Sequence, residues 1–128
     1  MKACDIGTLL SILPKLTITS DTTAEQAEAA FPMLASFNQG GIFVGHFSGL
    51  APWERHTGGD ELLYLMEGES EITVLTESKP VQITLRAGSV FVVPQGLWHR
   101  QLAREGATLL SATPQPSEIS IAEDPRKS

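Results

Sequence analysis

Short runs of β-forming residues recur along most of this chain, and this rhythm limits the possible folds more than any other feature. From residue 42 to residue 113 the runs are rich in Ile, Val, Phe and Thr, and Gly or Pro separates them at intervals of about ten residues. Closely spaced strands of this kind are typical of an all-β sandwich or barrel. The expected strands are Ile42–Ser48, Trp53–Thr57, Glu61–Glu67, Ser70–Thr76, Val81–Leu85, Ser89–Val93, Trp98–Arg104 and Thr108–Thr113.

The residues before these strands have a different texture. We expect a short helix around Ile6–Leu13 and a strand at residues 15–19, where apolar side chains alternate with polar ones. Further on, Thr22 stands three residues before Glu25, which is the spacing of a capping box, and good helix formers follow. The sequence therefore predicts a second helix, which Pro32 ends.

The length of 128 residues suits one domain with a single core. We divide it into a strand and helix leader at residues 1–39 that packs on the barrel, the β-barrel itself at residues 40–113, and a polar tail at residues 114–128. The tail is rich in proline, so we expect it either to be loose or to lie over the barrel or a partner subunit.

The charge of the chain argues against a polyanionic partner. Nine basic and fifteen acidic side chains give a net charge of −6, and no basic stripe is visible, so neither nucleic acid nor a membrane surface is an expected partner. No apolar run is long enough to span a membrane, and Asp5 interrupts the one segment that resembles a signal peptide. The single cysteine, Cys4, excludes an internal disulfide, and we expect a cytoplasmic protein.

Several metal-binding side chains gather between residues 54 and 61. If Gly58 and Gly59 formed a two-residue primed turn, His56 would pair with Glu61 across a hairpin, and both side chains would point to one face. Glu54 shares that face with His56 because side chains alternate along a strand. Asp60 has the opposite parity to Glu61 and is expected in the turn or in solvent.

Two carboxylates beside a buried histidine would repel each other, and a divalent cation removes this conflict. A further candidate ligand, His99, begins the strand after a turn that contains Pro94 and Gly96, and Gln101 shares its face. If that face is the inner one, His56, Glu61 and His99 form a group of two histidines and one carboxylate. Such a group suits Fe(II), Mn(II) or Zn(II), with Glu54 as a possible fourth ligand.

These spacings resemble the two motifs of the cupin superfamily. The second motif is matched at Gly88, Pro94, Gly96 and His99, while Ala103 replaces its final asparagine. The first is matched at His56, Glu61 and Gly68, while Glu54 stands where the family has its first histidine and the leading Gly49 is one residue closer than usual. Together the two motifs cover residues 49–103.

The resemblance implies a jelly-roll barrel, or double-stranded β-helix, with a divalent transition metal (Fe, Mn, Zn or Ni) in its mouth. Residues matching His56, Glu61 and His99 would hold the metal in such a protein. Glu54, at the first-histidine position, could coordinate the metal, accept a proton beside it, or turn away. The resemblance also implies a homodimer, because cupins commonly pair through a sheet face or through exchanged terminal strands.

Two functions from different classes remain open. The first is a metal-dependent enzyme, for example a dioxygenase or an isomerase, in which Glu54 is ligand or base and Gln101 orients a small organic substrate. The second is a binding or sensing module that uses the same barrel for a small ligand and the metal for structure alone. A storage role is a weaker third, because it needs no intact ligand set.

Other noticeable side chains have ordinary explanations. His46 lies outside both motifs, so we expect a packed, hydrogen-bonded histidine. Trp53 and Trp98 flank the motif strands and could either form a platform for a ligand or pack under a loop. Arg55 and Arg100 each adjoin a candidate ligand in sequence and should therefore point away from it.

Overall fold

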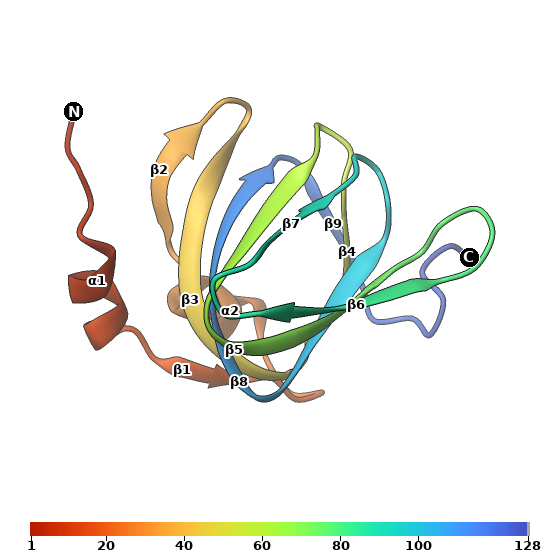
Figure 1. Ribbon diagram of the computed structural model, residues 1–128, viewed down its shortest axis with the longest axis horizontal. Helices are drawn as coiled ribbons and strands as arrows, with labels where there is room; N and C mark the ends of the chain where they lie inside the picture. The colour runs from red at the N-terminus through yellow and green to blue at the C-terminus, as the bar shows by residue number, and fades with distance from the viewer. Residues whose placement is uncertain (128) are drawn as a thin grey trace.

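Two long antiparallel strands form the centre of the molecule in a computed structural model that describes residues 1–127 (Figure 1). They are β5 (Glu61–Val74) and β8 (His99–Pro114), which pair along most of their length. Around them lie the remaining elements, α1 (Ile6–Ile12), β1 (Lys15–Thr17), α2 (Ala24–Ala30), β2 (Met33–Phe37), β3 (Gly40–Leu50), β4 (Trp53–His56), β6 (Val81–Arg86), β7 (Val90–Val93) and β9 (Ser117–Ser120).

Each long strand corresponds to two strands of the sequence prediction. The predicted break after Glu67 and the one after Arg104 are instead bends within β5 and β8. At the bends Gly68 has a φ of 81° and Gly106 a φ of 103°, and the β5–β8 register shifts there. Glycine in this conformation lets a strand bulge and bend without ending, so both strands continue around the barrel.

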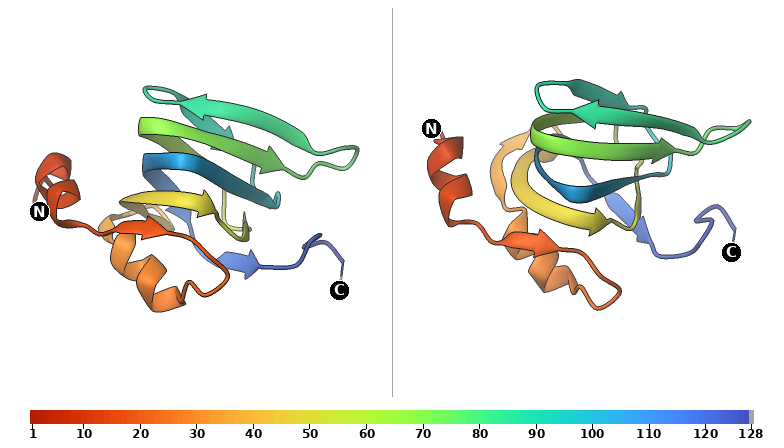
Figure 2. Two further views of the ribbon diagram at one scale, coloured as in Figure 1. Left: turned by 90° about the horizontal axis from the view of Figure 1, so that it is seen from below. Right: turned by 60° about the horizontal axis from the view of Figure 1, so that its bottom comes forward.

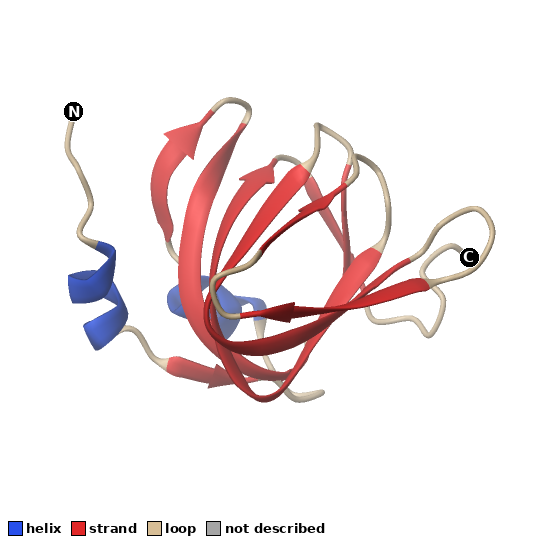
Figure 3. Ribbon diagram, in the orientation of Figure 1, coloured by secondary structure: helices blue, strands red, loops and turns tan. Residues whose placement is uncertain are grey.

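The strands close into the expected jelly-roll barrel (Figures 2 and 3). The strand β8 pairs with β3 along one edge and with β5 along the other, while β6 and β7 extend the sheet beyond β5. All these pairings are antiparallel, and only β1 joins β3 in parallel. The all-β prediction is therefore confirmed, with the two helices outside the barrel.

Apolar side chains from the inner faces of these strands fill the barrel. On β5 they alternate with exposed or half-buried residues, as expected when one face of a strand meets the core. The buried cluster consists of Phe47, Leu63, Leu65, Ile72, Val74, Leu85, Val93, Ala103, Ala107 and Leu109. The candidate ligands lie on the same inner face, so they stand at the edge of an apolar interior.

The leader forms its two predicted helices, with one correction. The capping box of α2 joins Thr23 and Gln26, not Thr22 and Glu25. The Thr22 hydroxyl instead accepts a hydrogen bond from the Thr19 backbone N–H, which belongs to the preceding turn. The helix therefore begins one residue later than predicted. None of the helices in residues 1–127 is long and apolar enough to cross a membrane.

The predicted hairpin between residues 53–57 and 61–67 does not form. The strand β4 pairs with β9 and, through Glu54 opposite His99, with β8, whereas β5 pairs with β6, β7 and β8. A primed turn needs positive φ at its central residues, and neither Gly58 nor Gly59 has it. Instead the backbone at Gly58 packs so closely on the Gln115 carbonyl that a Cβ atom would lie 2.4 Å from it.

The C-terminal tail lies on the barrel. Its strand β9 runs antiparallel to β4, with Ser117 opposite His56 and Ser120 opposite Trp53. Of the two alternatives for the tail, the one that drapes it over the barrel is confirmed for this segment. Ser128, the last residue of the predicted tail, lies outside the described residues.

Candidate metal centre

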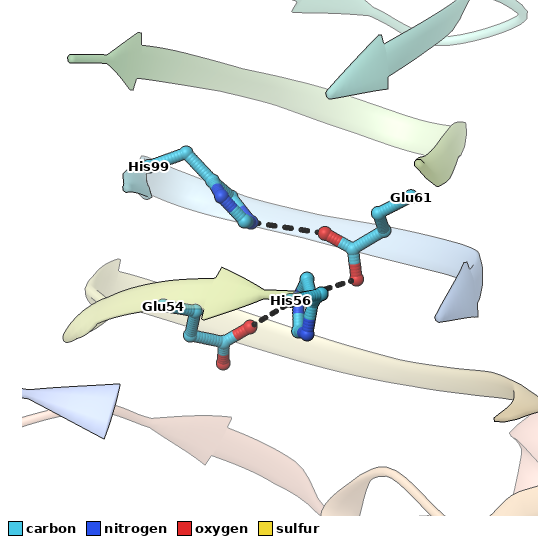
Figure 4. Close-up of side chains that lie close together, drawn as sticks. All are labelled: Glu54, His56, Glu61 and His99. Atoms are coloured by element: carbon cyan, nitrogen blue, oxygen red, sulfur yellow. Dashed lines mark hydrogen bonds and ion pairs between the residues drawn. The ribbon is translucent and has the colours of Figure 1, made fainter. Parts of the chain in front are cut away.

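Four predicted ligands meet at one end of the barrel (Figure 4). Glu54 and His56 come from β4, Glu61 begins β5 and His99 begins β8. One ligand atom from each lies within 4.8 Å of the ligand atoms of the other three. The four side chains therefore lie together as expected, although the hairpin used to justify their proximity does not form.

Glu61 is the central residue of this cluster. Its carboxylate is buried, and Oε1 lies 2.9 Å from His99 Nε2 while Oε2 lies 3.4 Å from His56 Nε2. The Thr113 hydroxyl donates to Oε2 over 2.6 Å. Ser111 Oγ lies 2.9 Å from Thr113 Oγ1. Because Thr113 has a single hydroxyl proton, Ser111 must be the donor in that second contact, so two hydroxyls in series orient Glu61.

His99 is fixed by the backbone of the turn before it. Its Nδ1 lies 3.0 Å from the Leu97 carbonyl oxygen, which can only accept a hydrogen bond. Nδ1 therefore carries a proton, and in the neutral ring the lone pair sits on Nε2, on the side of Glu61. This is the tautomer that a metal ligand bound through Nε2 requires.

His56 faces the same centre from the other side. Its ring is almost completely buried, and its Nδ1 lies 2.9 Å from Ser117 Oγ. Its Nε2 lies 3.5 Å from Glu54 Oε2 and 3.4 Å from Glu61 Oε2, but it makes no hydrogen bond. A buried polar atom without a hydrogen bond is rare and calls for an explanation, and an ion among these atoms would supply one.

The charges of the site are strongly coupled. Burial lowers the pKa of His56, but the neighbouring Glu54 and Glu61 outweigh burial and raise that pKa to about 9. Burial raises the pKa of Glu61, yet contacts with His56 and His99 reverse the effect and lower it to about 2. The pKa of His99 is likewise raised, because Glu61 outweighs the effect of burial. Without a metal, the site therefore holds its carboxylates against protonated histidines.

The donor set and its spacing fit a divalent transition ion. Metal bonds of about 2.0–2.2 Å to nitrogen and oxygen place adjacent ligand atoms roughly 3 Å apart. The closest separations in the cluster are 2.9, 3.4 and 3.5 Å. Two carboxylates and two neutral imidazoles would also balance a charge of +2, and Glu54, with 39% of its side chain exposed, lies on the open side.

The remaining histidine has the ordinary role expected of it. His46 Nδ1 lies 2.8 Å from Thr108 Oγ1, and its Nε2 lies 3.0 Å from the Leu10 carbonyl oxygen. The second contact ties α1 to β3. Asp60 likewise acts in a turn, where its carboxylate accepts from the Gln95 backbone N–H at 2.8 Å.

Gln101 is not part of the four-residue cluster. Its side-chain oxygen accepts a hydrogen bond from the buried Ser70 hydroxyl at 3.1 Å. That contact engages the side-chain oxygen, and among residues 1–127 the amide nitrogen makes no hydrogen bond. A role for Gln101 with substrate remains a proposal.

The two tryptophans pair with the two arginines beside the site. The Arg100 guanidinium lies 4.3 Å from the Trp53 ring centroid, and that of Arg55 lies 4.8 Å from the Trp98 ring centroid. Arg55 also forms an ion pair with Glu118 of β9. Trp53 is buried, which favours packing over a ligand platform for that residue.

Sequence reasoning missed the residues that orient the ligands. Thr113 and Ser111 alternate in the mostly apolar last part of β8, and this pattern of two buried hydroxyls could have marked them. No spacing rule pointed to Ser117, because the path of a polar tail over a barrel leaves no periodic signal. Its contact with His56 is visible only in the folded chain.

The fold and the site together are those of a jelly-roll barrel whose mouth carries two histidines and two carboxylates that could hold a metal. The chain matches the model of the family described as "Cupin domain" over residues 46–111. These residues include all four candidate ligands. The chain therefore belongs to the cupin family, as its motifs indicated.

The chain is similar to one curated protein and to two solved structures described below. It is 37% identical over 79 residues to germin-like protein subfamily 2 member 2 of Arabidopsis thaliana, covering 58% of this chain and 36% of the relative. The chain thus spans about a third of that relative's length. It is also similar to a cupin-2 domain containing protein from Shewanella frigidimarina, with a TM-score of 0.54 and 26% identity over 70% of this chain and 79% of the other. Recombinant oxalate oxidase in complex with glycolate gives a TM-score of 0.52 and 26% identity over 63% and 45%.

Proposed function

We propose that this protein is a small metal-binding cupin that carries out metal-dependent chemistry on a small organic molecule, of the dioxygenase or isomerase type. The observation that carries the proposal is the buried His56 Nε2, which makes no hydrogen bond and faces the carboxylates of Glu54 and Glu61. His56, Glu61, His99 and Glu54 would hold the ion. A bound transition metal would supply Lewis-acid or redox activation of a substrate or of dioxygen.

The protein's own groups would divide the remaining tasks. Glu54 is the most exposed of the four side chains, so it would either complete the ligand set or accept a proton from a molecule on the open side. Gln101 would orient the substrate through its amide nitrogen, because its oxygen is already engaged by Ser70. The similarity to an oxalate oxidase that binds glycolate supports a substrate of few atoms.

The alternative is a module that binds a small ligand without turning it over. Glu54 favours this reading, because a fourth protein ligand closes a tetrahedral site, and closed four-ligand sites are typical of structural metals. A metal that prefers six ligands would keep two positions for ligand or dioxygen. The identity of the ion therefore decides between the two functions.

We also propose a cytoplasmic homodimer that binds neither nucleic acid nor membrane. The net charge of −6 supports the second part. An exposed apolar strip on the outer face of β5 and β7 supports the homodimer. In this strip Leu62 stands opposite Val92, and Val90 lies nearby. Sedimentation of the wild type and of a Leu62→Glu/Val92→Glu variant tests it, and a wild-type monomer would contradict it.

Metal analysis is the direct test of the site. We expect protein purified without added metal, or reloaded with one, to hold about one equivalent, and the His56→Ala/His99→Ala variant to hold none. His46→Gln is the matched control, because His46 is the third histidine and lies outside the cluster. Wild-type protein that binds no ion, and whose melting temperature no added metal raises, would contradict the proposal.

Oxygen uptake separates the enzyme from the binding module. The wild type loaded with Fe(II) is given a panel of small organic acids and phenols under air, with the His56→Ala/His99→Ala variant as control. Substrate-dependent uptake in the wild type alone supports an oxygenase. Binding of a panel member without uptake or conversion supports the binding module.

A further inference from the structure

The C-terminal strand β9 touches the candidate metal centre directly. It runs along β4 with Ser117 opposite His56, Glu118 opposite Arg55 and Ile119 opposite Glu54. One short strand thus lies beside the two ligands that β4 contributes. Figure 1 shows this strand beside β4, near the end of the chain.

Ser117 contacts Nδ1 of the His56 ring, the nitrogen that points away from the candidate metal position. A serine hydroxyl 2.9 Å from Nδ1 can accept a proton from that nitrogen or donate one to it. When it accepts, Nδ1 carries the proton and Nε2 has the lone pair that faces Glu61 and Glu54. When it donates, Nε2 is protonated and cannot bind a metal. A metal bound through Nε2 therefore requires that Ser117 accept the proton of Nδ1.

Within β9 itself few side chains contact the barrel, although the Gln115 N–H before it donates to the Gln39 carbonyl and Arg126 after it donates to the Thr76 carbonyl. Ile119 is 65% exposed and Ile121 is 95% exposed, so the tail buries little apolar surface. The Arg55–Glu118 ion pair is partly exposed, with 35% and 46% of the two side chains accessible, and ion pairs in contact with solvent contribute little to stability. Among the side chains of β9, Ser117 is the one whose hydroxyl contacts a buried ring of the barrel.

We propose that Ser117 is a positioning residue for the metal, and that docking of β9 and occupation of the metal site stabilise each other. This inference rests on the proposed metal site. When β9 is docked, Ser117 holds the His56 ring in its metal-binding tautomer, and when it is released, Nδ1 becomes open to water. Linkage requires the two effects to be equal: the factor by which docking strengthens metal binding is the factor by which metal strengthens docking.

The first test is Co(II) and Zn(II) affinity, measured by competition with a chelating indicator. Ser117→Ala should weaken both affinities by about tenfold, the lower end of the range for residues that orient metal ligands. Ser117→Thr keeps the hydroxyl and should restore most of the affinity. Ser120→Ala is the matched control, because Ser120 lies on the same strand opposite Trp53 and only its hydroxyl oxygen is engaged, by the Ala122 backbone N–H.

The second test uses the unmodified chain, so it does not depend on how a variant folds. Amide hydrogen exchange at residues 117–120 should slow by about tenfold when Zn(II) is added, while exchange in α1, which lies away from the site, stays unchanged. The same comparison in Ser117→Ala should show a much smaller slowing.

The outcomes separate this inference from the proposed function. Wild-type protein that binds the metal as tightly as Ser117→Ala overturns the role of Ser117, and the metal site stands. Equal weakening in Ser117→Ala and Ser120→Ala also overturns it, because the hydroxyl contact would then not be the cause. Wild-type protein that binds neither ion overturns both the site and the inference.

Discussion

The site is built from two regions of very different strength. Glu61 and His99 begin the long strands β5 and β8, which hold the fully buried Leu63 and Leu65 and pair with each other over most of their length. Glu54 and His56 belong to the four-residue β4, which meets β8 at one residue pair and otherwise pairs with β9. Two of the four candidate ligands are therefore carried by the core, and two by the edge of the barrel.

The two regions should therefore contribute differently to folding stability and to metal affinity. The core pair would be preformed in the empty protein, because the hydroxyls of Thr113 and Ser111 and the Leu97 carbonyl fix Glu61 and His99. The edge pair depends on a short strand and on the tail. We expect changes in the first region to affect folding and metal binding together, and changes in the second to affect metal binding with little effect on folding.

The largest contrast should appear in stability. Leu65→Ala on β5 removes a side chain with no exposed surface and should lower the free energy of unfolding by about 2–5 kcal/mol. Ile119→Ala on β9 changes a side chain that is 65% exposed and should change it by less than about 0.5 kcal/mol. Urea denaturation of the metal-free proteins measures both. Equal losses in the two variants would show that β9 is as much a part of the core as β5.

The two carboxylates should differ in their effect on metal binding. Glu61→Gln keeps the shape of a buried ligand but removes its charge, and should weaken Co(II) affinity by at least about a hundredfold, more than the loss of an orienting residue. Glu54→Gln, at the exposed edge, should weaken it by about tenfold. Competition with a chelating indicator measures both values.

The result for Glu54 also decides its role. An unchanged affinity in Glu54→Gln would remove it from the ligand set and leave it as a proton acceptor or a solvent-facing group. A loss as large as that of Glu61→Gln would show that the edge of the barrel binds the ion as firmly as the core does, contrary to the comparison of the two regions.

The sequence predicted the core half of this architecture better than the edge half. The spacing from His56 to Glu61 and the run from Gly88 to His99 pointed to three of the four side chains that the structure brings together. The turn proposed between His56 and Glu61 was nevertheless wrong. Its two glycines suggested a hairpin turn. In the structure Gly58 instead leaves room for the Gln115 carbonyl, which packs where a larger residue would have its Cβ atom.

Features that depend on distant parts of the chain were not predictable in this way. The joining of two expected strands into β5 depends on Gly68 packing against Gly106, where a Cβ atom would lie 2.2 Å from a carbonyl oxygen. The partnership of Ser117 with His56 depends on the path of the tail. Neither leaves a periodic pattern, because each is a contact between segments far apart in sequence.

A smaller effect should follow from the hydroxyl that supports Glu61. Thr113→Val keeps the volume of the side chain but removes the donor to Oε2, and should lower the free energy of unfolding of the metal-free protein by about 1–3 kcal/mol. Thr113→Ser keeps the hydroxyl and is the control. Urea denaturation that shows no difference between the two variants would mean that Glu61 finds another donor.

The last contrast concerns the dependence of metal affinity on pH. The pKa of His56 in the metal-free protein is raised to about 9, so a metal must displace a proton from His56 at any lower pH. Co(II) affinity should therefore rise about tenfold per pH unit for each proton released, from pH 7 until it levels near pH 9. Metal-free stability should show the opposite trend. A pKa raised above its ordinary value of 6.5 contributes stability that is complete below that value and is lost as pH rises through about 9.

Glu54→Gln sharpens this test, because Glu54 is one of the two carboxylates that raise the pKa of His56. In that variant the affinity should level at a lower pH than in the wild type, while Ser120→Ala should leave the profile unchanged. If the two profiles coincide, the edge carboxylate does not act on His56, and Glu61 alone sets the charge of the site. The edge of the barrel would then contribute a ligand position but no electrostatic control, which would confine the coupling of the two regions to the core.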